Sequence, residues 1–146
     1  MNSNPAENPP NVNQVLQAVV GVAMRDDRFL VIRRSRLVRA PFKLCLPGGQ
    51  WEPGESQSEA VVRELHEELN LVVQPQRLIW SSVSPWGTEL FWWSIRVDER
   101  AAIVPNPAEV ESYAWMSSAQ LLSSPALLES AADFLRSYQS GQVAWP

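Results

Sequence analysis

The most acidic stretch of the chain, residues 48–71, reads GGQWEPGESQSEAVVRELHEELNL. It contains six glutamates and a single arginine, Arg63. At about 100° per residue of an α-helix, Glu64, Glu67 and Glu68 fall within roughly one third of the circumference. This sector lies beside the apolar positions of the same helix, which are Val61, Val62, Leu65 and Leu69. The three carboxylates are therefore expected to border the buried face.

Carboxylates at this spacing repel one another and raise one another's pKa values, and the cost grows near a core. One arginine cannot balance three of them. A hard divalent cation can, because Mg²⁺ prefers oxygen ligands, is often held by one or two carboxylates, and completes its shell with water and substrate phosphates. The cluster therefore indicates a metal site, with Mg²⁺ as the expected ion and Mn²⁺ as the alternative.

The residues before this helix fit the same chemistry. Gly48 and Gly49 bring a backbone without side chains to the start of the helix, so main-chain groups can approach a metal or a phosphate. Seven of the twelve basic residues lie just upstream, and they are Arg25, Arg28, Arg33, Arg34, Arg36, Arg39 and Lys43. An anionic substrate would be attracted to this side of the molecule.

The spacing of these residues resembles the Nudix box, G-x5-E-x7-R-E-U-x-E-E-x-G-U, where U is a bulky aliphatic residue. The matching residues are Gly49, Glu55, Arg63, Glu64, Leu65, Glu67, Glu68 and Leu71. Asn70 stands where the box has its second glycine. Asparagine is the next best residue after glycine for a left-handed helix cap, so this departure concerns helix termination more than chemistry.

The resemblance implies a role for each matching residue. Glu64, Glu67 and Glu68 correspond to the metal-binding glutamates of the family, and Glu55 corresponds to the box glutamate near the metal. Arg63 corresponds to the arginine that orients a glutamate through a charge-assisted pair. A carbonyl of Gly48 or Gly49 would be a further metal ligand.

Many members of the family place another glutamate after the box, as a metal ligand or general base. Glu109 is the choice here, with Glu111 as the alternative. The general base is left open between Glu64, Glu67 and Glu109.

The activity that the resemblance implies is metal-dependent hydrolysis of the P–O–P bond in a nucleoside diphosphate linked to another group. The small size favours the MutT-like group, which resembles nucleoside triphosphate pyrophosphohydrolases. ADP-ribose, nucleotide-sugar and coenzyme A pyrophosphatases are the alternatives, as is a catalytically silent nucleotide-binding module. No box carboxylate is missing, which favours the enzyme.

Substrate contacts are also expected from residues that are not fixed positions of the box pattern itself. Arg33, Arg34 and Arg39 are the candidates for phosphate binding, because they lie in the basic stretch. Trp51 and Trp86 lie in expected loops and are candidates for stacking on a base or closing over the pocket. Trp80, Trp92, Trp93 and Trp115 alternate within strands, which favours a core or interface role.

The elements that must position these residues follow from local signals. Ser56 with Glu59 three residues later forms a capping-box pattern, so the acidic helix should begin there and end at Asn70. Residues 14–24 and 29–32 predict a hairpin around Arg25-Asp26-Asp27-Arg28. Further strands are expected at residues 71–73, 77–83, 90–97 and 110–116. Ser117 and Ser124 predict caps for a short helix and for a longer one over residues 126–139.

These elements predict one α/β domain over residues 14–146, and the resemblance implies a Nudix-type α/β/α sandwich with a mixed central sheet. Residues 1–13 are polar and proline-rich and are expected to form a disordered tail. With 45% hydrophobic and 19% charged residues, the chain can bury a substantial core.

Composition also limits the partners. A net charge of −4 argues against nucleic-acid binding, and no apolar run is long enough to span a membrane. The single cysteine, Cys45, favours a reducing, cytoplasmic location. The expected partner is a small nucleotide or nucleotide derivative, and a homodimer is left open.

Overall fold

The computed structural model describes residues 15–145, so the tail expected at residues 1–13 lies outside the described residues. The strands are β1 (Gln17–Val22), β2 (Met24–Arg25), β3 (Arg28–Arg34), β4 (Leu44–Cys45), β5 (Gly48–Gln50), β6 (Gln74–Val83), β7 (Glu89–Arg96) and β8 (Val110–Ser117). The helices are α1 (Gln57–Leu69), α2 (Ser118–Leu122) and α3 (Glu129–Gln139). None of the helices in this part of the chain has the length and apolar character needed to cross a bilayer.

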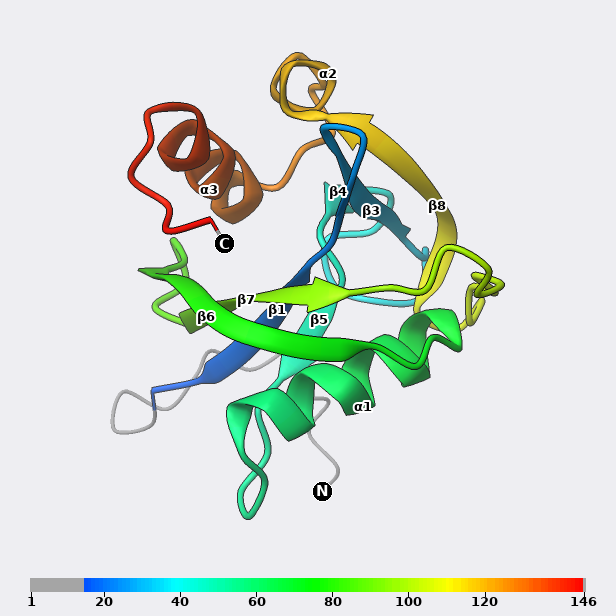
Figure 1. Cartoon of the computed structure of the whole chain (residues 1–146). Coiled ribbons are helices and arrows are strands. Elements are labelled where there is room, and N and C mark those ends of the chain that lie inside the picture. Colours follow the sequence, from blue (N-terminus) through cyan, green and yellow to red (C-terminus); the bar gives the residue numbers. More distant parts are fainter. Residues whose placement is uncertain (1–14, 146) are drawn as a thin grey trace.

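Two four-stranded sheets form the centre of the molecule. The first has the order β5-β1-β7-β6, with β1 and β7 parallel and the other neighbours antiparallel. The second joins β2, β3 and β4, and β8 pairs antiparallel with β3. Figure 1 shows α1 on one side of the strands and α3 on the other. The expected α/β class with a mixed sheet is confirmed, although the strands divide into two sheets.

Helices α1 and α3 cover different hydrophobic clusters. Val61, Leu65 and Leu69 of α1 pack in one cluster, which also contains Val19 of β1. Phe134 of α3 belongs to the other cluster, where its ring stacks on Trp92 at a centroid distance of 4.4 Å. The sheets therefore separate two cores, and α1 presents one apolar face to the strands while its acidic border lies at their edge.

The expected hairpin forms only in part. The turn is at Asp26 and Asp27, both with positive φ (51° and 60°), and it joins β2 to β3. The long apolar run before it divides at Ala23, because β1 pairs with β5 and β7 in the other sheet. This division carries the chain from one sheet to the next.

Helix α1 begins and ends as the sequence predicts. The side chain of Ser56 accepts a hydrogen bond from the Glu59 backbone N–H, and the Glu59 side chain accepts from the Ser56 N–H. At the other end Asn70 adopts the left-handed conformation (φ 54°, ψ 31°), and its side-chain amide donates to the Val104 carbonyl at 2.6 Å. Both ends of α1 are held, so its carboxylates occupy fixed positions relative to the strands.

Two predicted elements are wrong in their extent. Residues 71–73 form no strand but connect α1 to β6. The last helix begins at Glu129 rather than near residue 126, and Leu128 precedes it without a side-chain cap. The Leu128 N–H instead donates to the Leu44 carbonyl, and the Leu44 N–H donates to the Ala126 carbonyl. This pairing holds the chain extended beside β4, so Ser124 caps only a turn.

Substitutions at Asn70 should separate its two contributions. Asn70→Gly keeps the left-handed backbone but loses the bond to Val104, whereas Asn70→Ala loses both. We expect Asn70→Ala to be less stable than Asn70→Gly by about 1 kcal/mol, because a Cβ disfavours the left-handed region. Urea unfolding of the three proteins measures the difference, and equal stability of the Ala and Gly variants would contradict the capping role.

Candidate active site

Two glycines allow β5 to pass directly beside the acidic helix. A Cβ at Gly48 would collide with the Val19 carbonyl of β1, and a Cβ at Gly49 would collide with the Glu64 carboxylate. The Gly48 N–H donates to Glu68 Oε1 at 2.7 Å. The backbone of this strand therefore lies against two carboxylates in the second half of α1, rather than at the start of the helix where it was expected.

Arg63 is the centre of a network of ion pairs. It binds Glu55 through two bonds, from Nε to Oε2 at 3.0 Å and from Nη2 to Oε1 at 2.7 Å. Its Nη1 donates to Glu64 at 2.9 Å and to Glu67 at 3.3 Å, and Nη2 also donates to the Gln50 carbonyl at 2.8 Å. This hydrogen bonding lowers the pKa of Glu55 and raises that of Arg63. Arg63 therefore joins β5, the following loop and α1.

Three carboxylates from two distant parts of the chain line one small cavity. The cavity has a volume of about 220 Å³, and Glu64, Glu68 and Glu109 contribute to its wall together with Arg34. Glu64 and Glu68 are only 8% and 6% exposed. Glu109 Oε2 is buried and has no hydrogen-bond partner among residues 15–145. The structure thus brings Glu109 to the box residues, as expected, whereas Glu111 is exposed on β8.

Burial dominates the electrostatics of this cavity. It raises the pKa of Glu64 to about 7, with the charges of Glu67 and Glu109 acting in the same direction and Arg63 opposing them. Burial also raises the pKa of Glu68 well above its ordinary value, and the charge of Glu64 adds to this shift. The Gly48 N–H and Arg34 offset the shift only in part. The site therefore concentrates carboxyl groups whose ionised form its own cations stabilise only in part.

Asn106 is a positioning residue that the sequence analysis missed. Its backbone N–H donates to the Glu68 carbonyl at 2.8 Å, and its side-chain amide donates to the Glu67 carbonyl at 3.2 Å. The Glu109 N–H in turn donates to the Asn106 carbonyl. The loop that carries Glu109 is therefore attached to the end of α1. An asparagine between two prolines, Pro105 and Pro107, was the signal available.

A larger cavity of about 620 Å³ adjoins the acidic one, and both are lined by Arg34, Gly49 and Gln50. Arg39 and Trp86 form part of its wall, and the Arg39 guanidinium lies 4.7 Å from the centroid of the Trp86 ring. Arg34 Nε donates to the Arg39 carbonyl at 2.6 Å. The two cavities together form a cleft with an acidic end and an end lined by arginine and tryptophan.

Other predicted site residues lie outside this cleft. The side chain of Glu67 is 44% exposed and is held by Arg63, and Glu55 is also engaged by Arg63. Arg33 donates to the Phe42 carbonyl and lines neither cavity. Trp51 donates its indole N–H to the Glu55 carbonyl and packs edge-on against Phe91, so it supports the loop before α1. The structure does not bring Arg33 and Trp51 to the cleft.

The donor atoms of the acidic cavity suit a divalent cation in their chemistry. Across residues 15–145, no three side chains of His, Cys, Asp or Glu already converge at coordinating distance. The chemistry of the donors nevertheless fits, because Glu64, Glu68 and Glu109 carry hard oxygen donors that repel one another. In addition, one oxygen of Glu109 accepts no hydrogen bond from the part of the chain that the structure describes. Movement of these side chains toward the cavity would be needed to complete such a site.

A comparison with protein families agrees with this geometry. The family model for the NUDIX domain matches residues 15–138. The chain belongs to the Nudix family. Proteins of this family act on small nucleotide derivatives and generally use divalent metal ions.

Individual Nudix relatives are only moderately similar to the chain. An ADP-ribose pyrophosphatase from Methanocaldococcus jannaschii is 43% identical over 70 residues, which cover 47% of this chain and 40% of that protein. Phosphatase NudJ from Escherichia coli K12 is 28% identical over 129 residues, which cover 85% of this chain and 83% of that protein. The chain thus spans less than half the length of the first relative and most of the second.

Solved Nudix structures share the fold. A MutT protein from Methanosarcina mazei Go1 superposes with a TM-score of 0.75 at 23% identity, covering 90% of this chain and 98% of that one. The ORF135 protein of E. coli superposes with a TM-score of 0.71 at 23% identity, covering 91% of this chain and 94% of that one. At these identities the likeness concerns the fold alone.

The raised carboxyl pKa values give the metal-free protein a pH-dependent stability. Between the ordinary value of 4.5 and about 7, folded Glu64 holds a proton that the unfolded chain has released. The free energy of unfolding therefore falls as pH rises through this window. We expect Glu68→Gln to relieve the repulsion and to raise the unfolding midpoint near pH 8 by roughly 2–5 °C, with little change near pH 4.

Thermal unfolding followed by circular dichroism, in the presence of a chelator, measures this effect. Glu99→Gln is the matched control, because Glu99 is exposed and lies outside the cleft. A Glu68→Gln variant that is less stable than wild type near pH 8 would show that the carboxylate is stabilising there.

Proposed function

We propose that this protein is a metal-dependent hydrolase that cleaves the P–O–P bond of a nucleoside diphosphate linked to another group. The observation that carries the proposal is the cavity lined by Glu64, Glu68 and Glu109 beside the glycine strand β5. A polyphosphate is the substrate class that can supply anionic oxygens to a cation held by such carboxylates. The arginine-lined end of the same cleft suits the rest of an anionic substrate.

The proposed metal ligands are Glu64, Glu67 and Glu68 of α1, with Glu55, the carbonyl of Gly48 and Glu109 as further candidates. When bound, Mg²⁺ or Mn²⁺ would neutralise phosphate charge and lower the pKa of a water molecule. Glu67 would have to give up its hydrogen bond from Arg63 in order to bind the metal, because Arg63 holds the Glu67 side chain outside the cavity. The bonds from Arg63 to Glu55 keep the arginine in place while this exchange occurs.

The chain's own groups would carry the remaining steps. Water attacks one phosphorus, the bond from that phosphorus to the bridging oxygen breaks, and a carboxylate takes the proton of the water. Glu109 is the strongest candidate for this base, because its unpartnered oxygen lies in the cavity wall beside Glu64. Glu64 and Glu67 are the alternatives. Arg34 lines both cavities and is the proposed cation for the phosphate chain.

The nucleoside is proposed to occupy the larger cavity. Trp86 is 69% exposed and forms part of the cavity wall, so an aromatic base can stack against its ring. Arg39 lies over that ring and would stack or pair with the incoming group. This arrangement supports Trp86 and Arg39 as substrate residues more strongly than Trp51 and Arg33.

Nucleoside triphosphates are the favoured substrates, because the small size of the chain resembles that of the MutT-like group. ADP-ribose is the next candidate, given the similarity to an ADP-ribose pyrophosphatase over 70 residues. Nucleotide sugars and coenzyme A follow. A silent nucleotide-binding module is disfavoured, because every carboxylate of the Nudix box is present.

Hydrolysis can be tested directly with the purified protein, Mg²⁺ and a panel of nucleoside triphosphates, ADP-ribose, nucleotide sugars and coenzyme A. Product analysis identifies both the substrate and the bond that is cut. We expect Glu67→Gln combined with Glu68→Gln to abolish turnover and metal binding while the protein stays folded, because the ligands are lost and repulsion is relieved. Glu99→Gln combined with Glu111→Gln removes the same charge from exposed positions and should keep activity.

Wild-type turnover by the Glu67→Gln, Glu68→Gln protein would overturn the site assignment. No cleavage of any compound in the panel by wild type, with either Mg²⁺ or Mn²⁺, would favour the silent module.

A second pair of variants tests the role of Glu109. We expect Glu109→Gln to lower kcat by at least about 100-fold, because a general base or a metal ligand contributes on this order. Glu111→Gln should stay within about twofold of wild type, since Glu111 is exposed and two residues away along the chain. Steady-state kinetics with the best substrate of the panel measures both. Equal activity of the two variants would contradict the role of Glu109.

A further inference from the structure

A second groove lies at the opposite end of the parallel strands from the cleft. It has a volume of about 390 Å³, and Ala23 and Ile95 lie in its lining at the ends of β1 and β7. The cleft is lined by Ala18 and Leu90, near the starts of the same strands. At about 3.3 Å per residue, the five-residue step from Ala18 to Ala23 separates the two cavities by roughly 16 Å. The groove is therefore distinct from the proposed active site.

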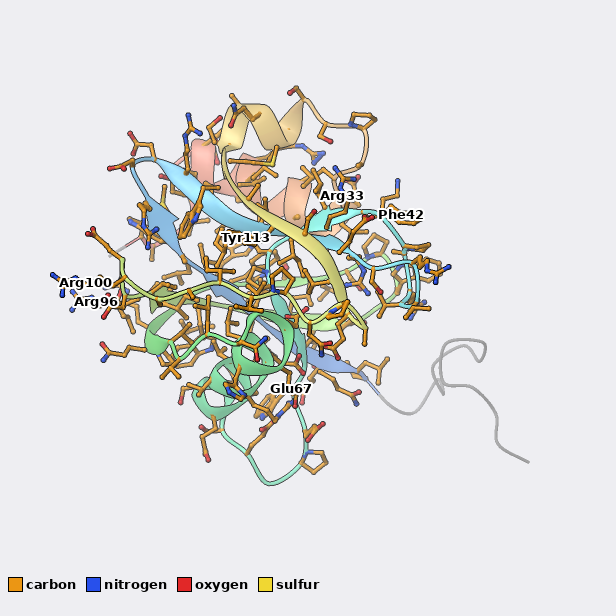
Figure 2. All side chains as sticks on the ribbon, turned by 90° about the vertical axis from the view of Figure 1, so that its right-hand side faces the viewer. Arg33, Phe42, Glu67, Arg96, Arg100 and Tyr113 are labelled. Atoms are coloured by element: carbon orange, nitrogen blue, oxygen red, sulfur yellow. The ribbon has the colours of Figure 1, made fainter. Side chains whose placement is uncertain are left out.

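The groove is lined by two arginines, Arg25 and Arg96, that have no acidic partner within the described part of the chain. No carboxylate of residues 15–145 lies within 4.0 Å of the guanidinium of Arg25 or Arg96. Arg25 also lies directly opposite Arg28 in the β2–β3 register, a like-charge pair that costs stability. In Figure 2 Arg96 projects from the same edge of the molecule as Arg100. An anion in the groove would offset this concentration of positive charge.

Neighbouring elements hold the Arg25 side chain in place. Its guanidinium lies 4.4 Å from the centroid of the Trp115 ring, which is half-buried on β8. The tight turn at Asp26 and Asp27 fixes the backbone that follows Arg25. A guanidinium held over an aromatic ring loses less conformational entropy on binding an anion than a free surface arginine does.

The remaining walls suit a flat, partly apolar molecule. Trp115 and Trp145 contribute two indole side chains, and Gln76 contributes an amide that can donate and accept hydrogen bonds. Ala23 and Ile95 are buried and add apolar surface. Aromatic rings beside guanidinium groups bind ligands that combine a ring with a phosphate. The volume lies in the range of pockets that hold ligands of nucleotide size.

We propose that this groove is a second ligand site, separate from the cleft, for a phosphorylated aromatic small molecule such as a nucleoside monophosphate. Arg25 and Arg96 bind the phosphate, Gln76 binds a polar edge of the ring or sugar, and the tryptophans contact the ring. No bond is made or broken at this site.

Binding of AMP in a chelator, measured by isothermal titration calorimetry, tests the proposal without turnover. We expect Arg25→Gln combined with Arg96→Gln to weaken AMP binding at this site by at least about tenfold, because two charge-assisted contacts are lost. The matched control is Arg28→Gln combined with Arg100→Gln, which removes the same charge from nearby exposed residues that do not line the groove. This control should change the affinity less than about twofold.

A further double variant, Arg39→Gln with Trp86→Ala, tells whether AMP binds in the cleft instead. These two residues line the cleft and not the groove, so AMP binding in the groove should be unchanged in this variant. Hydrolysis by the Arg25→Gln, Arg96→Gln protein should equal that of wild type, so failure of this proposal is separate from failure of the proposed hydrolase activity. Inorganic phosphate and adenosine are the two partial probes, and each should bind more weakly than AMP.

Equal weakening of AMP binding by Arg25→Gln, Arg96→Gln and by the control Arg28→Gln, Arg100→Gln would overturn the proposal. It would show that AMP responds to the overall positive charge of this surface and not to a specific site. Phosphate binding as tight as AMP would overturn the aromatic part of the assignment. Thermal unfolding confirms that each variant is folded, and Arg96→Gln alone, at an exposed position, gives a second measurement with little risk to the fold.

Discussion

The burial of two glutamates beside a third is the constraint on which the arrangement of this protein depends. Glu64 and Glu68 lie one helical turn apart, almost fully buried, and Glu109 faces them from another part of the chain. A folded protein normally avoids such a cluster, because each charge loses hydration and raises the pKa of its neighbours. Stability alone gives no reason to keep it. Protonation of Glu64 and Glu68 relieves part of this cost in the metal-free protein, and a cation bound in the proposed site would relieve it as well. The cost is therefore itself an argument for function.

The rest of the fold holds this cluster in place. The glycines of β5 let the strand approach the carboxylates, and the Gly48 N–H donates a hydrogen bond to Glu68. Arg63 fastens α1 to the preceding loop, and Asn106 fastens the loop carrying Glu109 to the other end of the helix. Both ends of α1 are capped. A site built on a capped helix and a paired strand keeps its donors within small distances of one another, which catalysis at a phosphate requires.

Features fixed by nearby residues could be predicted from the sequence, and features fixed by distant ones largely could not. The capping box at Ser56 and the left-handed cap at Asn70 depend on a few adjacent residues, and both were predicted correctly. Helical spacing also identified Glu64 and Glu68 as bordering the core, but it wrongly included Glu67, which is exposed. The start of α3 was missed because Leu44, more than eighty residues earlier, pairs with the chain around Ala126.

The candidate site shows the same division between local and distant information. Box spacing placed Glu64 and Glu68 together, but nothing in it showed that Glu67 would turn outward to Arg63. Glu109 was chosen by resemblance, and the contact that positions it, through Asn106, appears only in three dimensions. Trp51 looked like a loop residue free to stack, yet its indole N–H is committed to the Glu55 carbonyl.

The distribution of charge along the cleft explains how an acidic protein can attract an anion. The carboxylates lie at one end, and Arg34 lies at the junction with the larger cavity, where it lowers the pKa of Glu68 and lines both spaces. Its Nε is bonded to the Arg39 carbonyl, so the residue next to the acidic cluster is linked to the residue that lies over Trp86. A phosphate drawn to Arg34 would therefore lie between the carboxylates and the aromatic wall. The net charge of the whole chain affects an anion in the cleft less than these nearby arginines do. At physiological salt, charges act mainly over about 8 Å.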